Sequence, residues 1–497
     1  MAGVQHTEDA AVSQPKPLFH DAGPLADPLE RRVIFAALDS FHLHMVFDRN
    51  YPDQRMSAPD TDGGQGGMAA FRLAASSYGM IALLARGVLN EGLVLDRGQG
   101  PLNFTSHDAY RKNAHYNTTH RRRQNLYALP SVQWRMLAAP PFSILDTLNA
   151  VDDALDHNAD LADQIFRLGA GAFGLPEKPH VDSWMNWQGK AKPNDISKAH
   201  STIRQFYRDW SHEGFTLEVE PLLKTILSDL ESIFPAVQQH NQSPSLLLPG
   251  AGLGRVLFEL SLRGFHATGN EISYHQLLAS NFILNNAERA HQYSVYPFAH
   301  TFTNVVSRAN QLKCYTVPDV HPGEAFSSRL SAGLPVGEMN MTAGDFVLSY
   351  STPDSKETFD GVVSLFFVDT APNLLRYIQT VRNCLKTGGA WINIGPLLWH
   401  FDDRGPGGNT DDDDELGDNT RPESGPSSQP KPDLEDKGIA EPGSFELTDE
   451  EVVQLVSRTG FEVITHEILP ADSGYIQDPN SLLQNRYRCS HWVARKV

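Results

Sequence analysis

Apolar residues recur at helical spacing through the first part of the chain. Between residues 145 and 168 they stand three to six residues apart, at Leu145, Leu148, Val151, Leu155, Leu161, Ile165 and Leu168. A second stripe runs from Leu222 to Ile233. This spacing places the apolar side chains on one face of a helix. We therefore predict an α-helical N-terminal region, with further helices over residues 32–45 and from Ser201.

From Ser245 on, short apolar or β-branched runs alternate with helical patterns of 10 to 18 residues. The strand-like runs are LLLPG, FHATGNE, FDGVVSLFFVDTA and AWINIGPLLWHF. Such alternation is typical of crossover connections and of a parallel sheet that helices cover on both faces. Residues 448–469 add one more helix and strand, and NRYRCSHWVARKV ends the chain as a strand. The pattern predicts an open α/β sheet with an antiparallel edge.

The polar stretches divide the chain. We expect a disordered tail at 1–30, a helical region at 31–200 with an insert at 48–106, and an α/β domain at 201–497. The insert at 48–106 begins with turn formers and then contains the apolar patch SSYGMIALLARGVL. This patch could form a helix or be part of the insertion. A second insert at 402–443 has 13 acidic residues, four basic residues and few apolar ones, which predicts a solvated loop. This loop either recruits a basic partner or is a tolerated surface insertion.

Charge and cysteine content narrow the class of protein. The net charge of −19 over 497 residues disfavours nucleic acid and anionic membranes as partners. The adjacent Arg121, Arg122 and Arg123 fit a solvated helix face better than a nucleic-acid site. Three scattered cysteines indicate a reducing compartment. Because no secretory signal or spanning segment is legible either, we expect a cytoplasmic protein that can also be nuclear.

The sequence LLLPGAGLGR places Gly250, Gly252 and Gly254 between a buried strand and a helix. Glycines let the chain turn sharply and let a ligand approach the backbone. Glu271 follows Gly250 by 21 residues, at the end of the next strand, where an acid can accept both ribose hydroxyls. A nicotinamide enzyme shares these features, and tight helix packing alone could also use Gly252 and Gly254. The helix that closes in KTGG at 386–389 before a strand favours S-adenosylmethionine-dependent methyltransferases.

Asp345 and Phe346 follow Gly344 in MTAGDFVLSY. In a methyltransferase-like sheet, an acid here meets the adenine amino group and an aromatic ring covers the purine face. The alternative is an aspartate in a loop that ends an edge strand. Position favours the role in ligand binding.

Longer strings identify a family. The chain resembles the carnosine N-methyltransferase family in RQFYRDWSHEG (204–214), in LLLPGAGLGRVLFELSLRGFHATGNEISYHQLLASNFILN (246–285), and in MTAGDF, FFVDTAPN and WINIGPLLWHF. The resemblance covers most of the chain outside the two inserts. It departs at the inserts and at Arg488, where the family more often has an aromatic run. It implies a Rossmann-like class I methyltransferase sheet with an α-helical N-terminal region.

The resemblance also implies an activity and its residues. The activity is transfer of a methyl group from S-adenosylmethionine to the imidazole of carnosine, at the pros nitrogen, or of a related histidine-containing dipeptide, which gives anserine. A homodimer is compatible with it. The implied cofactor-binding residues are Gln205, Arg208, Gly250, Gly252, Arg255, Glu271, Asp345 and Phe346. The implied substrate-binding residues are Phe366, Phe367, Asp369, Thr370, His400 and Tyr487, of which Asp369, His400 and Tyr487 would be catalytic.

The chemistry of the reaction makes these residue types sensible. A neutral imidazole needs no strong base to become a nucleophile, but only one ring nitrogen can face the methyl group. A carboxylate that accepts the other N–H fixes the tautomer, and Asp369, after an apolar strand, is our candidate. Asp369 could instead cap a helix, and His400 and Tyr487 could be core residues. Phe366 and Phe367 could serve packing alone.

We weigh three other hypotheses, of which the first is also a methyltransferase. A protein histidine methyltransferase would present the same imidazole in a peptide. A non-catalytic cofactor-binding scaffold would use the acidic insert to hold a partner. A metal enzyme is disfavoured, because no pair among the 20 histidines has ligand spacing with supporting acids.

Overall fold

The computed structural model describes residues 24–42, 116–237, 243–401, 444–470 and 472–497. The insert predicted at 48–106 and the acidic insert at 402–443 lie outside these residues. Within them, no helix combines the length and the apolar character that crossing a membrane requires.

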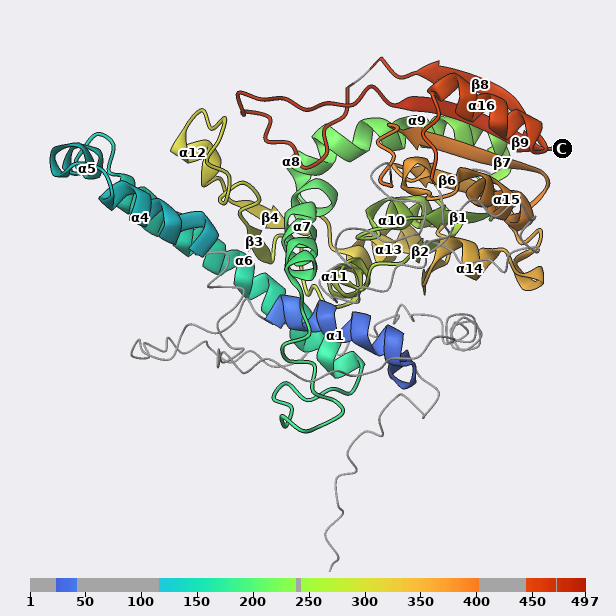
Figure 1. The fold of residues 1–497 in the computed structure, drawn as a ribbon. Helices are drawn as coiled ribbons and strands as arrows, with labels where there is room; N and C mark the ends of the chain where they lie inside the picture. Colours follow the sequence, from blue (N-terminus) through green and yellow to red (C-terminus); the bar gives the residue numbers. More distant parts are fainter. Residues whose placement is uncertain (1–23, 43–115, 238–242, 402–443, 471) are drawn as a thin grey trace, which may run out of the picture.

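A seven-stranded sheet forms the centre of the α/β part, in the order β5-β2-β1-β6-β7-β9-β8 (Figure 1). The strands are β1 (Ser245–Pro249), β2 (His266–Glu271), β5 (Met339–Ala343), β6 (Phe359–Leu365), β7 (Leu385–Gly395), β8 (Phe461–Ile468) and β9 (Ser490–Lys496). The first five run parallel, and β9 is antiparallel to both β7 and β8. The predicted Rossmann-like methyltransferase sheet is confirmed. Its antiparallel strand, β9, lies between β7 and β8 and not at the edge as predicted, and the edge strand β8 runs parallel to the first five.

The strand order reverses between β1 and β6, because the chain leaves β1 towards β2 but leaves β6 towards β7. In open α/β sheets, such a switch point opens a crevice beyond the carboxyl ends of the two strands. The ends of β1 and β6 are therefore the place where this fold predicts a ligand site.

Helices flank and connect the strands, and the sequence pattern predicts five of the eight but not the three within residues 308–350. They are α9 (Glu220–Ile233), α10 (Arg255–Leu262), α11 (Tyr274–Asn285), α12 (Arg308–Gln311), α13 (Pro322–Ser331), α14 (Phe346–Tyr350), α15 (Leu374–Cys384) and α16 (Asp449–Arg458). Local sequence explains several boundaries. Thr448 and Glu451 form a capping box at the start of α16, and the side chain of Asn373 accepts the N–H of Arg376 at the start of α15.

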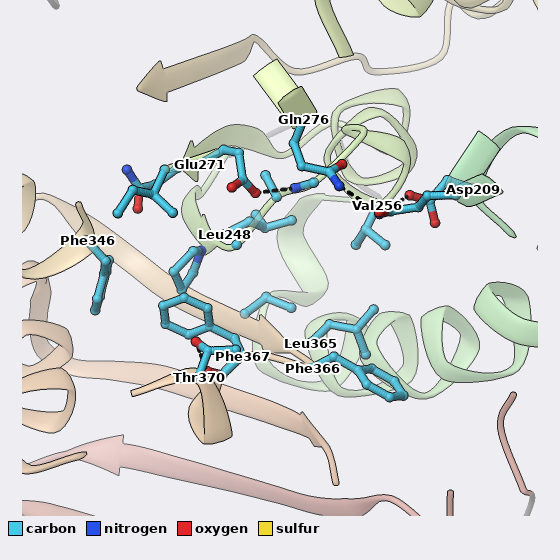
Figure 2. Close-up of a pocket in the computed structure, with 18 of the residues that line it drawn as sticks. Asp209, Leu248, Val256, Glu271, Gln276, Phe346, Leu365, Phe366, Phe367 and Thr370 are labelled. Atoms are coloured by element: carbon cyan, nitrogen blue, oxygen red, sulfur yellow. Dashed lines mark hydrogen bonds between the residues drawn. The ribbon is translucent and has the colours of Figure 1, made fainter. Parts of the chain in front are cut away.

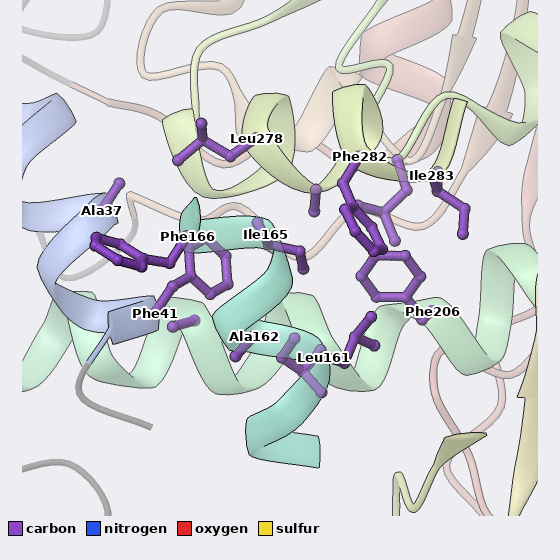
Figure 3. Close-up of a cluster of buried hydrophobic side chains, with 14 of the residues drawn as sticks. Ala37, Phe41, Leu161, Ala162, Ile165, Phe166, Phe206, Leu278, Phe282 and Ile283 are labelled. Atoms are coloured by element: carbon purple, nitrogen blue, oxygen red, sulfur yellow. The ribbon is translucent and has the colours of Figure 1, made fainter. Parts of the chain in front are cut away.

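The N-terminal helices pack on the α/β part through one shared core. They are α1 (Pro28–His42), α4 (Arg121–Tyr127), α5 (Ser131–Ala138), α6 (Ile144–Ala172), α7 (Pro193–Trp210) and α8 (His212–Gly214). Figure 3 shows Phe41 of α1, Phe166 of α6, Phe206 of α7 and Phe282 of α11 meeting in this core. The end of α6 that carries α4 and α5 extends away from the sheet (Figure 1).

The shared core corrects two predicted boundaries. The tail predicted at 1–30 is wrong for its last residues, because a 3₁₀ turn covers Pro24–Ala26 and α1 starts at Pro28. Leu25 belongs to the core, so burial holds this segment in place. The boundary predicted at residue 201 falls inside α7. The helical region and the sheet are consequently joined by a continuous helix.

Two further details differ from the sequence-based expectation. The KTGG segment at 386–389 lies within β7, where a register irregularity against β6 accommodates it. An antiparallel pair, β3 (Tyr293–Val295) and β4 (Tyr315–Val317), was not predicted. Its strands are only three residues long, too short for an alternating pattern to be legible.

Candidate functional site

The loop between β1 and α10 forms the floor of the site. Gly250, Gly252 and Gly254 all have positive φ angles, of 68°, 57° and 77°. A Cβ on Gly250 would lie 2.8 Å from the ring of Phe367, and a Cβ on Gly252 would lie 3.1 Å from Nε2 of Gln205. Only glycine combines this backbone conformation with so little space. The loop therefore exposes its backbone to the crevice at the switch point.

Glu271, at the end of β2, holds this loop from the side. Its Oε2 accepts the N–H of Gly252 at 3.0 Å, and its Oε1 accepts the N–H of Ser273 at 2.8 Å. Burial raises the pKa of Glu271, although the backbone N–H groups oppose this by favouring the charged form. A carboxylate offers about four acceptor positions, so both oxygens can still receive hydroxyl groups of a ligand.

Helix α7 supplies a hydrogen-bonded row of polar side chains on the opposite side of the loop. Gln205 donates from Nε2 to Asp209 at 3.0 Å and accepts from Nε2 of Gln276 at 2.8 Å. Nη1 of Arg208 donates to the other oxygen of Asp209 at 2.7 Å. These groups are buried, so the row is rigid and presents a fixed pattern of one cation and one anion.

Asp345 and Phe346 begin α14 at the far edge of the sheet. Oδ1 of Asp345 accepts the N–H of Leu348 at 3.0 Å, so the residue is the N-cap of this helix. The ring of Phe346 packs edge to face on Phe367, with centroids 5.3 Å apart. Asp345 thus follows an edge strand, as the alternative expects, and its ligand role stays a prediction.

These parts surround one cavity of about 380 Å³, a size suited to a small ligand. Figure 2 shows Glu271 and Phe346 towards one end and Asp209 at the other, with Phe366 and Phe367 along one side. All eight predicted cofactor-binding residues line it: Gln205, Arg208, Gly250, Gly252, Arg255, Glu271, Asp345 and Phe346.

Arg255 reaches this cavity differently from the rest. Its guanidinium forms a pair of hydrogen bonds with Asp319 and a third with Glu259 at 3.0 Å. It also lies over the ring of Phe215, 3.8 Å from the centroid. The charge of Arg255 is therefore engaged in holding α10 against its neighbours.

Five of the six predicted substrate residues follow the carboxyl ends of β6 and β7, and the sixth, Tyr487, precedes β9. Phe366, Phe367, Thr370 and His400 line the cavity. Phe366 has a φ of 54°, a left-handed conformation that is costly for a bulky side chain and is found mainly at functional sites. Its ring lies 5.6 Å from that of Tyr475 and 5.9 Å from that of Tyr487. The three rings form an aromatic wall.

Asp369 and Tyr487 lie outside the lining of this cavity. Asp369 is 2% exposed, and its Oδ2 accepts the N–H of Leu398 at 2.9 Å, while its carbonyl accepts the N–H of His400 at 3.1 Å. Burial raises its pKa, with the Leu398 N–H and the charge of His400 acting in the opposite direction. Asp369 thus holds the segment that carries His400. Tyr487 lines a second cavity of about 300 Å³, which shares Tyr475 with the first.

Sequence reasoning did not single out four residues of the site. Asp209, Gln276, Tyr377 and Tyr475 all line the first cavity. Asp209 stands in the quoted string RQFYRDW, one residue after Arg208, so its position on the same helix was a usable signal. Tyr475 had none, because it follows the acidic insert in a stretch without periodicity. Its ring lies 4.7 Å from the guanidinium of Arg208.

Comparisons with known proteins identify relatives of this chain. The family model described as carnosine N-methyltransferase matches residues 185–497. The carnosine N-methyltransferase of Schizosaccharomyces pombe is 32% identical over 357 residues, which are 71% of this chain and 83% of that protein. The rat protein of the same name is 31% identical over 74% of this chain and 79% of its own length. The mouse protein is 29% identical over 88% of this chain and 97% of its own length.

Proposed function

This chain belongs to the carnosine N-methyltransferase family and is a methyltransferase, and we propose that it methylates the imidazole of carnosine with S-adenosylmethionine. The pros nitrogen of the ring receives the methyl group, and the product is anserine. Related histidine-containing dipeptides are acceptors of the same class. The observation that carries this proposal is the cavity of about 380 Å³ at the β1/β6 switch point, where the glycine loop after β1 meets the aromatic wall.

The residues around the cavity fit S-adenosylmethionine, which supplies an electrophilic methyl group on a sulfonium centre. Glu271 accepts the ribose hydroxyls, and Asp345 with Phe346 holds the adenine. The fixed pair of Arg208 and Asp209 matches the carboxylate and the ammonium of the methionine end. The glycine loop leaves room for the ligand to approach the backbone.

On the acceptor side, the protein has to orient a neutral ring and exclude water. The aromatic wall of Phe366, Tyr475 and Tyr487 packs against the imidazole plane. The same ring faces stabilise the cation that the ring becomes on transfer. No general base is required to form the nucleophile, because an imidazole is largely deprotonated at neutral pH.

We propose that Asp369 fixes the tautomer of the acceptor through its hold on the segment that carries His400. The support is its place at the end of β6 and its hydrogen bonds to residues 398 and 400. A buried carboxylate at this point would also stabilise the imidazolium product.

The test of the activity is product identification with the purified chain. We expect carnosine and S-adenosylmethionine to give a singly methylated dipeptide by mass spectrometry, whose proton NMR spectrum matches anserine. Transfer to a histidine inside a peptide but none to carnosine would instead identify a protein histidine methyltransferase. Cofactor binding without transfer to any imidazole would identify a scaffold.

The role of Asp369 is tested by Asp369→Asn, which retains an oxygen for the Leu398 N–H and loses the charge. We expect kcat to fall by at least about 100-fold, the magnitude typical of removing one preorganised electrostatic partner. S-adenosylmethionine affinity by calorimetry should change less than about threefold, because this residue lies outside the cofactor lining. Activity within a few-fold of the unmodified enzyme would refute the tautomer role.

A further inference from the structure

The second cavity, next to the aromatic wall, contains a cation that the proposed reaction has not yet used. It is lined by Arg204, Tyr475, Tyr487 and Asp478, by the apolar side chains of Phe298, Val305, Ile476 and Leu483, and by the polar side chains of Thr301, Thr303, Asn304, Gln311, Gln477, Ser481 and Asn485. Arg204 and Arg208 are four residues apart on α7 and so project from the same side of the helix. Arg204 lines the second cavity, and Arg208 lines the first.

Arg204 has hydrogen-bonding capacity to spare. Its Nε donates to the carbonyl of Pro297 at 3.1 Å. Within the described part of the chain, that is the hydrogen bond its side chain makes, so the two terminal nitrogens remain for a ligand. Neither terminal nitrogen is among the side-chain atoms that are buried from solvent without a partner, so a ligand can reach both.

Two carboxylates bear on Arg204: Glu218, whose charge acts on its pKa, and Asp478, which lines the same cavity. Burial lowers the pKa of this guanidinium, and the charge of Glu218 opposes the shift. Both oxygens of Glu218, however, accept backbone N–H groups, from Ile476 and Gln477, at 2.7 Å each. Burial and the charge of Arg204 also lower the pKa of His200 to about 4 and that of His300 to about 3. These neutral imidazoles add no anion, and the carboxylate of Asp478 in the same lining accepts the N–H of Asn480 at 2.8 Å.

The two cavities meet at the place proposed for the acceptor ring. Tyr475 belongs to both linings, and Tyr487, from the second cavity, packs on Phe366, from the first. In a free dipeptide that ends in histidine, only two carbons separate the ring from the carboxylate. A ring against this wall therefore places its carboxylate at the entrance of the second cavity.

We propose that Arg204 binds the α-carboxylate of the acceptor and thereby selects dipeptides with a free C-terminal histidine over histidines within a protein chain. The guanidinium donates two N–H groups to the two carboxylate oxygens, the geometry in which arginine recognises this group best. This inference rests on the proposed function, and it names the substrate class that the site accepts.

The test compares carnosine with β-alanylhistamine, which is carnosine without its carboxylate, on the full chain and on Arg204→Gln. For the unmodified enzyme, we expect kcat/KM to be about 10- to 100-fold lower for β-alanylhistamine, as for loss of a charge-assisted hydrogen bond. In Arg204→Gln, kcat/KM for carnosine should fall to the value for β-alanylhistamine. The value for β-alanylhistamine itself should not change. The loss should appear mainly in KM.

Controls separate this role from a structural one. Arg289→Gln removes an exposed positive charge elsewhere and should leave both substrates unchanged. S-adenosylmethionine affinity should be unaltered in Arg204→Gln, which would show that α7 keeps its place. Equal use of both substrates by the unmodified enzyme, or equal losses for both in the variant, would overturn the proposal. If Arg204→Gln does not fold, the substrate comparison on the unmodified enzyme still decides. If the proposed function itself were wrong, neither carnosine nor β-alanylhistamine would be methylated.

Discussion

At the scale of single residues, two glycines with nearly the same φ angle distinguish the cost of the backbone conformation from the cost of a steric clash. Gly250 has a φ of 68° and Gly174, after the end of α6, has a φ of 65°. A Cβ on Gly250 would meet Phe367 at 2.8 Å, whereas among the described residues one on Gly174 would meet no atom within 4 Å. Alanine at either position carries the same conformational cost, but only Gly250 adds a clash at the cavity.

We therefore predict that Gly250→Ala weakens S-adenosylmethionine binding by more than about 10-fold, because Phe367 has to shift into the space of the ligand. Gly174→Ala should cost about 1 kcal/mol of folding free energy and leave the affinity unchanged. Calorimetric titration and urea denaturation of both variants measure the two effects. Equal affinities in the two variants would contradict a ligand at this loop.

At the scale of elements, one buried carboxylate connects two distant segments of the chain. Glu218 lies in a single π-helical turn (Phe215–Val219) between α8 and α9 and is 2% exposed. Its two oxygens accept the N–H groups of Ile476 and Gln477, and the carbonyl of Glu218 accepts the hydroxyl of Ser473 at 3.1 Å. Glu218 thus holds the loop that carries Tyr475, the residue of the aromatic wall that lines both cavities.

For this reason Glu218→Gln should loosen the Tyr475 loop, because an amide NH₂ group would face a backbone N–H that it cannot satisfy. We expect an unfolding free energy about 1–3 kcal/mol lower and a several-fold higher KM for carnosine. Hydrogen exchange at residues 475–478 should be faster. Glu213→Gln, which breaks a surface ion pair with Lys313, is the matched control. It should leave the KM and the hydrogen exchange unchanged and have little effect on the unfolding free energy. Unchanged exchange in Glu218→Gln would argue against the tie.

At the scale of the whole molecule, the sequence predicts the parts of the site that depend on neighbours along the chain. The loop after β1 and Glu271 at the end of β2 follow from a short pattern of strand, glycines and helix. The side chain of Arg255 does not, because its partner Asp319 is 64 residues away. The same holds for Tyr475, whose place is set by Glu218. Contacts between distant segments therefore had to come from the structure.

The C-terminal edge of the sheet gives the molecule a pH-dependent stability. His491 of β9 is 2% exposed, and its Nε2 meets Asp229 of α9 at 2.8 Å, while its Nδ1 meets Glu467 of β8 at 3.1 Å. Burial alone would lower the pKa of His491, but the hydrogen bonds and charges of these two acids raise it above its ordinary value. The charged imidazolium is therefore favoured in the folded state.

A pKa that is higher in the folded than in the unfolded chain stabilises the fold fully below the unfolded value of about 6.5. That contribution disappears as the pH rises through the folded value. The loss of unfolding free energy in His491→Gln should hence be larger at pH 6 than at pH 9, measured by urea denaturation at intervals between them. His466→Gln, which breaks a more exposed pair with Asp449, should cost less than about 1 kcal/mol throughout. A deficit in His491→Gln that grows with pH would mean that the two acids do not hold a charged ring, and that the edge of the sheet is stabilised by packing alone.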